Sequence, residues 1–324
     1  MKTVGIIGGS GYTGGELLRL VLHHPALALD FVYSTTRPGT KISETHADLW
    51  GEIDLAFTDQ VNPEVDVLFL CLGHGHSAAF LKAHHFSATT IVIDLSNDFR
   101  LSTHANFQER KFVYGLPEIH RDQIEKAQAI ANPGCFATAI ELALLPLAKT
   151  GQLQQAVHIN ATTGSTGAGV GLSPTSHFTW RNNNLSVYKA FTHQHLGEIR
   201  ETLNLKDKKT VPLFFLPQRG NFTRGIYATA YTAYNGTLDD AYALYDAFYK
   251  NAPFTKISRQ EVHLKLVINT NNCFLHLHQH EGILLITVVI DNLIKGASGQ
   301  AIQNLNLMMG WEETLGLQLK PNIF

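Results

Sequence analysis

One of the three cysteines in the sequence lies where a thiol is suited to nucleophilic chemistry. Cys135 follows a short apolar segment and the Asn-Pro-Gly turn at 132–134, and the apolar residues after it have helical spacing. A thiol in the first turn of a helix faces the positive end of the helix dipole, which favours the reactive thiolate. The alternative interpretation is a small buried hydrophobic side chain, which fits Cys71 and Cys273 better. We therefore predict that Cys135 is a nucleophile.

A glycine-rich segment at 8–15 indicates a dinucleotide-binding turn. It directly follows an apolar strand pattern and opens a helix with one apolar face. Glycines at its first, fourth and seventh positions let the backbone turn tightly and approach a pyrophosphate, whose charge then lies at a helix N-terminus. The alternative is a tight turn that binds nothing. The predicted cofactor contacts are Gly8, Ser10, Gly11, Tyr12, Thr13 and Gly14.

The end of the second predicted strand favours NADP over NAD. An acidic residue there would hold the ribose 2′-hydroxyl of NAD, but the chain has Ser34, Thr35 and Arg37 instead. Hydroxyl groups and a guanidinium suit the additional phosphate of NADP, although a solvated polar loop would look the same. A thiolate used with a nicotinamide cofactor has one particular use. It can displace phosphate from an acyl phosphate and give a thioester, which accepts hydride and releases an aldehyde.

The alternation of strands and helices predicts an α/β fold with two domains. Strand patterns at 3–8, 28–34, 65–72, 90–95 and 127–131 alternate with helical patterns, as in a Rossmann-type parallel sheet. Longer apolar or alternating segments at 157–163, 225–234, 263–269 and 282–291 predict a mostly antiparallel, mixed sheet. A helical pattern from Gly299 is expected to pack back on the first domain. The predicted domains are 1–148 with 298–324, for NADP binding, and 149–297, for catalysis and oligomerisation.

Composition limits the classes of partner and of compartment. The 324 residues carry a formal net charge of −2 with no run of like charges, so nucleic acid is not an expected partner. No apolar run reaches membrane-spanning length, and the N-terminus enters a strand pattern without an export segment. Three widely spaced cysteines are typical of reduced thiols. We expect a cytoplasmic enzyme that acts on a small molecule.

Several motifs in the same order resemble those of one known family, over essentially the whole chain. Besides the glycine-rich turn, they are Asp-Leu-Ser-Asn-Asp-Phe-Arg at 94–100, Tyr-Gly-Leu-Pro-Glu at 114–118, the turn around Cys135, and the segment 291–300. The chain resembles the N-acetyl-gamma-glutamyl-phosphate reductases of arginine biosynthesis. The resemblance implies a Rossmann domain and an α+β catalytic and dimerisation domain, as in the aspartate-semialdehyde dehydrogenase group. It also implies NADPH, Cys135 as the nucleophile, and a homodimer or homotetramer built through the second sheet.

The resemblance also assigns an acid and base to a histidine-rich segment at 193–199. His193 corresponds to the family's acid/base residue, His195 is the second candidate, and Glu198 is the orienting partner. An imidazole can both take the thiol proton and return a proton near neutral pH. Gln194 and Gly197 depart from the family pattern, which has arginine and proline there. The alternative is two surface histidines before a helix.

Arginines and loop residues complete the predicted site. Arg100, ending its motif, resembles the phosphate-binding arginine of the wider group, and Arg224 matches the family. Arg219 stands where the family usually has an apolar residue, and we expect it to compensate for Gln194. Each arginine alone could instead be a surface ion-pair partner. The predicted substrate residues are Arg100, Asn132, Arg219 and Arg224, and the additional cofactor residues are Ser165, Gly167 and Asn292.

Other interpretations of the sequence make different predictions. Aspartate-semialdehyde dehydrogenase shares the cysteine and the cofactor, but the Pro-Gly-Cys-Phe turn and the histidine segment favour the glutamyl enzyme. A short-chain reductase would need a Tyr-x-x-x-Lys pair, which the sequence lacks, and a non-catalytic NADP-binding redox sensor would not need Cys135 together with the histidines. We expect no metal, because no cysteine or carboxylate near His276, His278 and His280 completes a convincing set of ligands. The N-acyl group is open, since acetyl, succinyl or a carrier-linked chain would present the same phosphate to the thiol.

Overall fold

The computed structural model describes residues 1–205 and 211–323 and divides by its contacts into two compact units. The first unit is Met1–Gly134 with Ala297–Gln318, and the second is Cys135–Gly296 with the residues from Leu319 onward. The boundary predicted from the sequence lies near residue 148. Helix α5 (Cys135–Lys149) accounts for the difference, because it packs on helices and strands of the second unit.

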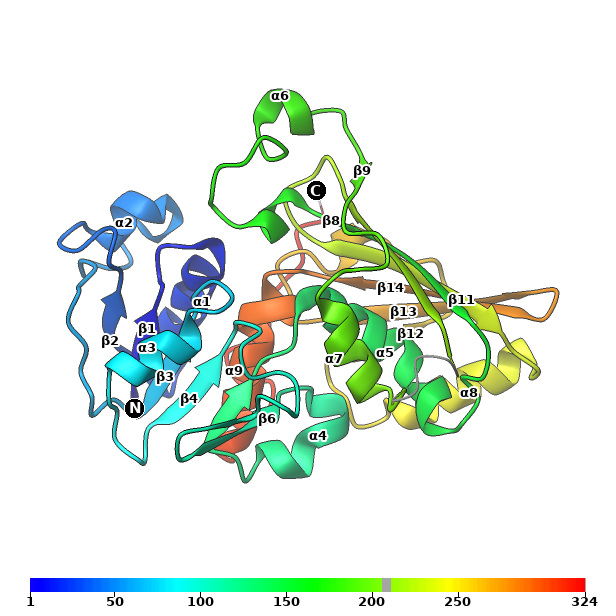
Figure 1. Cartoon of the computed structure of the whole chain (residues 1–324), viewed down its shortest axis with the longest axis horizontal. Helices are drawn as coiled ribbons and strands as arrows, with labels where there is room; N and C mark the ends of the chain where they lie inside the picture. Colours follow the sequence, from blue (N-terminus) through cyan, green and yellow to red (C-terminus); the bar gives the residue numbers. More distant parts are fainter. Residues whose placement is uncertain (206–210, 324) are drawn as a thin grey trace. The chain divides into compact units, whose positions relative to one another are not determined.

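The first unit contains a seven-stranded sheet in the order β2-β1-β3-β4-β7-β6-β5 (Figure 1). All neighbouring pairs are parallel except β5 with β6, and fully apolar strands such as β3 are typical of a sheet that is covered on both faces. The strands are β1 (Lys2–Ile7), β2 (Leu27–Tyr33), β3 (Val67–Leu70), β4 (Ile91–Asp94), β5 (Asn106–Phe107), β6 (Arg110–Tyr114) and β7 (Ala129–Ala131).

Helices cover this first sheet. Helix α9 contacts α1 and α4, as expected of the helical pattern after Gly299, while α3 contributes Phe80 and Leu81 to an apolar cluster with β3. The bounds are α1 (Tyr12–Leu22), α2 (Ile42–Thr45), the short 3₁₀ helix at Ala47–Leu49, α3 (Ser77–Ala83), α4 (Pro117–Ile124) and α9 (Gly299–Met308), which follows a π-helical turn at Ile294–Ser298.

The second unit contains a mixed sheet of seven strands in the order β12-β13-β14-β11-β8-β10-β9 (Figure 1). The β12–β13 and β8–β10 pairs are parallel and the other pairs are antiparallel. The predicted α/β class, with a Rossmann-type sheet and a second mixed sheet, is therefore confirmed. The strands are β8 (Val157–Thr163), β9 (Ser186–Val187), β10 (Leu213–Arg219), β11 (Ile226–Ala233), β12 (Thr255–Ser258), β13 (Cys273–His280) and β14 (Ile283–Ile290).

Helices α5 and α8 pack on one face of the second sheet. Burial alternates along β8 and β11, so each strand has one covered face and one open face. Helix α5 contacts β11, β14, α7 and α8, and α8 contacts β12 and β13. The remaining helices are α6 (Phe178–Arg181), α7 (His195–Thr202), α8 (Leu238–Phe248) and the 3₁₀ turns at Ser165–Ala168 and Leu264–Leu266.

A proline inside α5 is accommodated by two tyrosines. Pro146 has no N–H to donate to the carbonyl of Leu142, four residues before it. The hydroxyl of Tyr249 donates to that carbonyl at 2.6 Å, and the hydroxyl of Tyr245 donates to the Ala143 carbonyl at 2.6 Å. Tyr245 lies in α8 and Tyr249 directly follows it, so these bonds also fix α8 against α5, the helix that begins at the predicted nucleophile.

The strand predicted at 263–269 is wrong. The segment contains a 3₁₀ helix at Leu264–Leu266, and its backbone bonds locally, with the amide of Val267 donating to the Leu264 carbonyl at 3.0 Å. Val267 is buried in a small cluster with Val262 and Val289. The apolar residues of this segment therefore fill a cluster beside the sheet and add no strand to it.

Candidate active site

The glycine-rich turn between β1 and α1 is held by close backbone packing in the first unit. Gly8 has a φ of +79°, and a Cβ there would lie 2.7 Å from the carbonyl oxygen of Cys71. A Cβ on Gly14 would lie 2.6 Å from the Cα of Gly9. The amide of Gly8 donates to the Tyr33 carbonyl at 3.0 Å. Side chains are thus excluded at positions 8 and 14, and the first N–H groups of α1 lie beside the turn, which is the arrangement that binds a pyrophosphate.

The loop after β2 contains the residues predicted to read the ribose. Ser34 is buried, its amide donates to the Thr58 carbonyl at 2.9 Å, and its hydroxyl lies 3.3 Å from that of Thr36. Thr35 and Arg37 are exposed. The loop therefore has a fixed base and an exposed guanidinium, and these residues fit a nucleotide that carries an additional phosphate.

Arg100 and Asn132 organise the turn that precedes Cys135. The Nε of Arg100 donates to the Asn132 carbonyl at 2.9 Å, and one of its terminal nitrogens donates to the Leu95 carbonyl at 2.9 Å. The side-chain amide of Asn132 donates to the Ala297 carbonyl at 3.1 Å. Both residues are buried. These contacts give the two residues a structural role, and their predicted contact with substrate stays a prediction.

Cys135 is the first residue of α5 and is half-buried. A 15-residue helix gives its first turn a partial positive charge, which stabilises a thiolate there. Gly296 packs directly against the cysteine, because a Cβ at 296 would lie 2.7 Å from the Cβ of Cys135. Gly296 was not predicted from the sequence as a site residue, although it lies within the motif at 291–300.

The two candidate histidines lie next to the start of α5. The His193 ring centroid is 5.4 Å from that of Phe136, the residue after the cysteine, and 4.6 Å from that of His195. Both histidines are buried, and the amide of His195 donates to Nδ1 of His193 at 3.2 Å. Glu198 is also buried, with one carboxylate oxygen 3.8 Å from Nε2 of His195. The structure thus gathers the predicted catalytic residues of the second unit into one cluster.

Tyr188 belongs to this cluster and was missed from the sequence. Its ring centroid is 5.8 Å from that of His193. Burial raises the pKa of the Tyr188 hydroxyl to about 12, and the charge of Cys135 acts in the same direction. Arg219 acts in the opposite direction on this pKa, and its guanidinium carbon lies 4.7 Å from the ring centroid. The one signal in the sequence was the position of Tyr188 five residues before His193.

The remaining predicted residues form a separate network in the second unit. Arg224 pairs with the buried Asp291, with Nε–Oδ2 at 3.0 Å and a second bond at 3.2 Å. Asn292 accepts from the Gly225 amide at 2.6 Å and donates to the Thr166 hydroxyl at 3.1 Å. Thr166 lies in the 3₁₀ turn that contains Ser165 and Gly167. These bonds join loops to each other, and the predicted ligand contacts of Arg224, Asn292, Ser165 and Gly167 stay predictions.

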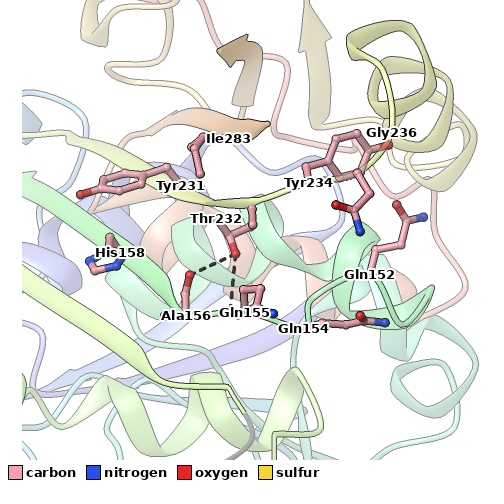
Figure 2. A pocket seen from close by; sticks show the side chains of 12 residues that line it. Gln152, Gln154, Gln155, Ala156, His158, Tyr231, Thr232, Tyr234, Gly236 and Ile283 are labelled. Carbon is pink, nitrogen blue, oxygen red and sulfur yellow. Dashed lines mark hydrogen bonds between the residues drawn. The ribbon is translucent and has the colours of Figure 1, made fainter. Parts of the chain in front are cut away.

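A hollow of about 510 Å³ in the second unit lies away from this cluster. It is at the opposite ends of β8 and β11 and is lined by side chains that include Gln152, His158 and Tyr231 (Figure 2). Thr232, which also lines it, donates to the Ala156 carbonyl at 3.1 Å. Within residues 1–205 and 211–323, no group of three histidine, cysteine or acidic side chains could hold a metal, and no helix is long and apolar enough to cross a membrane.

Two family models match this chain and define the class of protein. The model described as semialdehyde dehydrogenase, NAD binding domain, matches residues 3–127, and the semialdehyde dehydrogenase dimerisation domain matches residues 135–292. Solved structures agree on the fold. Aspartate semialdehyde dehydrogenase II from Vibrio cholerae aligns with a TM-score of 0.72 at 15% identity, covering 96% of this chain and 99% of that one. An aspartate semialdehyde dehydrogenase with NADP from Candida albicans gives 0.73 at 13%, covering 95% and 99%.

Sequence relatives narrow the class further. A protein of Flavobacterium johnsoniae is 58% identical and one of Bacteroides fragilis 48% identical, each over 100% of both chains. A protein of Christiangramia forsetii is 55% identical over 100% of both chains. All three are named N-acetyl-gamma-glutamyl-phosphate reductase. The chain belongs to this family, as the resemblance of its motifs predicted.

Proposed function

We propose that this chain catalyses the NADPH-dependent reduction of N-acetyl-gamma-glutamyl phosphate to N-acetylglutamate 5-semialdehyde and phosphate, a cytoplasmic step of arginine biosynthesis. The observation that carries the proposal is the position of Cys135 at the start of α5, beside the buried His193 and His195. The names of the full-length relatives support the same substrate.

The chemistry begins with attack of the Cys135 thiolate on the acyl carbon. A carbon–sulfur bond forms as the carbon–oxygen bond to phosphate breaks, so that phosphate leaves with its electron pair. The helix dipole of α5 stabilises the thiolate before attack. His193, with His195 as the alternative, takes the thiol proton and returns a proton when the reduced intermediate collapses to aldehyde and thiol. Glu198 orients the histidine pair through His195.

NADPH, when bound, supplies the hydride that reduces the thioester. The glycine-rich turn at 8–14 and the N-terminus of α1 would hold its pyrophosphate, since a Cβ on Gly8 or Gly14 would collide with backbone. Arg37, which is exposed, would hold the 2′-phosphate with the hydroxyls of Ser34 and Thr35. This choice of NADP over NAD rests on the lack of an acidic residue at the end of β2.

The open face of the second sheet supports assembly into a homodimer, or a homotetramer that contains it. Aromatic side chains gather on this face. The His158 ring stacks between Phe214 and Tyr231, with centroid distances of 5.0 and 5.1 Å. Phe214, Tyr227 and Tyr231 are each more than a third exposed. An exposed aromatic patch on a domain matched by a dimerisation model is the surface that a second copy would cover.

The reverse reaction tests the proposed activity. The enzyme is given N-acetylglutamate 5-semialdehyde, NADP and phosphate, and NADPH absorbance is followed for wild type and Cys135→Ala. We expect phosphate-dependent reduction of NADP by wild type and none by the variant. Cys71→Ala is the control, because Cys71 is a half-buried thiol of the first unit and should be dispensable for turnover. Turnover by Cys135→Ala, or none by wild type that binds NADP, would exclude this mechanism.

A further inference from the structure

Arg219 lies on the same sheet face as the catalytic cluster. It is the last residue of β10, and side chains two or four residues apart in a strand share one face. Phe215, four residues earlier, packs against His193 and Phe136 with ring centroids 5.5 and 5.3 Å apart. The guanidinium of Arg219 therefore projects from the end of the strand that supports the candidate acid/base residue.

One side chain separates Arg219 from the nucleophile. Its guanidinium carbon lies 4.7 Å from the ring centroid of Tyr188, and it hydrogen-bonds the Tyr188 hydroxyl. The same tyrosine is close enough to Cys135 for the charge of the cysteine to affect it. Tyr188 thus links Arg219 to the surroundings of Cys135, on the sheet face that carries the catalytic cluster.

In the described part of the chain, the charge of Arg219 is not neutralised by an acidic side chain. Within residues 1–205 and 211–323, no carboxylate pairs with it, and its buried Nε has no acceptor. A neighbouring guanidinium, Arg181, adds like charge. Burial and then Arg219 lower the pKa of Arg181. Leaving a buried charged donor without an acceptor is costly, so the arrangement is explained if a ligand supplies the acceptor.

The guanidinium of Arg181 is occupied by hydrogen bonds within the protein. Its nitrogens donate to the carbonyl of Arg219 at 2.7 Å, to the Thr175 carbonyl at 3.3 Å and to the Ser186 hydroxyl at 3.2 Å. These bonds fix the backbone of Arg219 and leave one guanidinium, not two, for a ligand. A single planar guanidinium with one positive charge matches a carboxylate in shape and in charge.

A second unsatisfied donor lies beside Arg219. Thr163 is the register partner of Arg219 in the parallel β8–β10 pair. Its side chain is buried, and in the described part of the chain its hydroxyl has no hydrogen-bond partner. Two neighbouring side chains thus each keep a donor that the fold does not satisfy.

We propose that Arg219, with the Thr163 hydroxyl beside it, binds a carboxylate of the substrate and so helps to set which acyl phosphates this enzyme accepts. This inference rests on the proposed function. The carboxylate has two sources: the α-carboxylate of the glutamyl group, or a carboxylate at the end of the N-acyl group, as in a succinyl substrate. The experiment distinguishes them.

The test uses three aldehydes in the reverse assay: N-acetylglutamate semialdehyde, its N-succinyl counterpart, and 4-acetamidobutanal, which has no carboxylate. Arg219→Met should raise the KM about 10- to 100-fold for the aldehyde whose carboxylate it binds, with a smaller change in kcat, and Arg219→Lys should restore part of the loss. If Arg219→Met raises the KM for both glutamyl aldehydes but not for 4-acetamidobutanal, Arg219 binds the α-carboxylate. If the KM rises for the succinyl aldehyde alone, Arg219 binds the carboxylate of the acyl group.

Arg259→Met is the matched control. Its guanidinium carbon also lies over a tyrosine ring, 4.0 Å from the centroid of Tyr242, but Arg259 follows β12 at the opposite edge of the sheet and pairs with Asp246. This variant should leave every KM unchanged.

Equal penalties for all three aldehydes, or a rise confined to the KM of phosphate, would overturn the carboxylate assignment. If wild type reduces no NADP with any aldehyde, the proposed function itself fails. Calorimetric binding of N-acetylglutamate and N-succinylglutamate to wild type and Arg219→Met then decides the assignment alone. Equal affinity of the two proteins for both ligands would overturn it.

Discussion

Two features of the structure support the prediction that Cys135 is the nucleophile: its helix N-terminal position and the imidazole groups beside the next residue, Phe136. The first turn of α5 stabilises the thiolate. The His193 and His195 rings, buried 4.6 Å apart beside Phe136, provide two imidazole groups that are able to accept a proton. Tyr188 adds a hydroxyl whose pKa of about 12 keeps it protonated and able to donate a hydrogen bond. The cluster is therefore equipped for thioester chemistry.

Asp94, at the end of β4, gives a residue-scale prediction about pH. It is fully buried, and burial raises the pKa of its carboxyl group to about 6, against hydrogen bonds from Ser77 and Ser96. The folded state therefore holds this proton more tightly than the unfolded state does. The protonated carboxyl group contributes its full stabilisation of the folded state below pH 4, and this contribution is lost as the pH rises through 6. Across that interval, the unfolding free energy of wild type minus that of Asp94→Asn should fall by up to about 3 kcal/mol.

Urea unfolding of both proteins between pH 4 and 7 measures this difference. Groups common to wild type and variant cancel in the subtraction. A difference that stays constant, or that grows as the pH rises, would contradict the prediction.

Among single residues, the sequence motifs predicted those whose position is set by neighbouring residues in the chain. Cys135 could be predicted because its helix start and preceding turn are contiguous in the chain. Tyr188 and Gly296 could not be predicted in this way. Tyr188 reaches the cluster only because its amide donates to the Pro217 carbonyl on β10, and Gly296 matters only because another segment brings it against Cys135. Contacts between distant segments leave no signal in the spacing of one sequence.

At the level of structural elements, the position of Cys135 at the start of α5 depends on the segment that packs against it. Gly296 lies in the π-helical turn Ile294–Ser298, and a Cβ there would lie 2.7 Å from the Cβ and 3.2 Å from the Cα of Cys135. Gly296→Ala should therefore displace the nucleophile and lower kcat about 10-fold or more, since small misplacements of a reacting group are costly. NADP affinity, measured by fluorescence titration, should stay unchanged.

Gly171→Ala is the control for this substitution. Gly171 lies in the same unit, and a Cβ there would meet no atom within 4 Å. This variant should retain full kcat. An unchanged kcat in Gly296→Ala would show that the turn does not position Cys135.

Periodicity predicted whole elements well where a strand runs through a sheet. The predicted segment 157–163 coincides with β8, and 282–291 contains β14. The strand predicted at 263–269 is wrong for a physical reason: the apolar residues of a short stretch can fill a local cluster as well as a sheet face, and the backbone bonds of the 3₁₀ turn are local. Helix α5 shows the same limit, because its packing partners, not its pattern, decide which unit it joins.

Oligomerisation gives the prediction at the scale of the whole molecule. Tyr231 lies on the open face of the second sheet, is 37% exposed, and stacks on His158. Tyr231→Asp would place a charge in an apolar interface, so the variant should be monomeric by light scattering, whereas wild type should be a dimer or tetramer.

Trp50→Asp serves as the comparison, because Trp50 is an exposed aromatic residue of the first unit at 84% exposure. It should keep the wild-type mass. A dimeric or tetrameric Tyr231→Asp protein would show that this face does not form the interface.

Direct observation of an acyl group on Cys135 tests the thioester mechanism. Enzyme is mixed with N-acetylglutamate semialdehyde and NADP without phosphate, and NADPH formation and intact mass are recorded together. We predict one NADPH per subunit and one N-acetylglutamyl group on Cys135, which added phosphate removes and which Cys135→Ser does not form. NADPH formation with no acyl group on Cys135 would contradict a thioester mechanism.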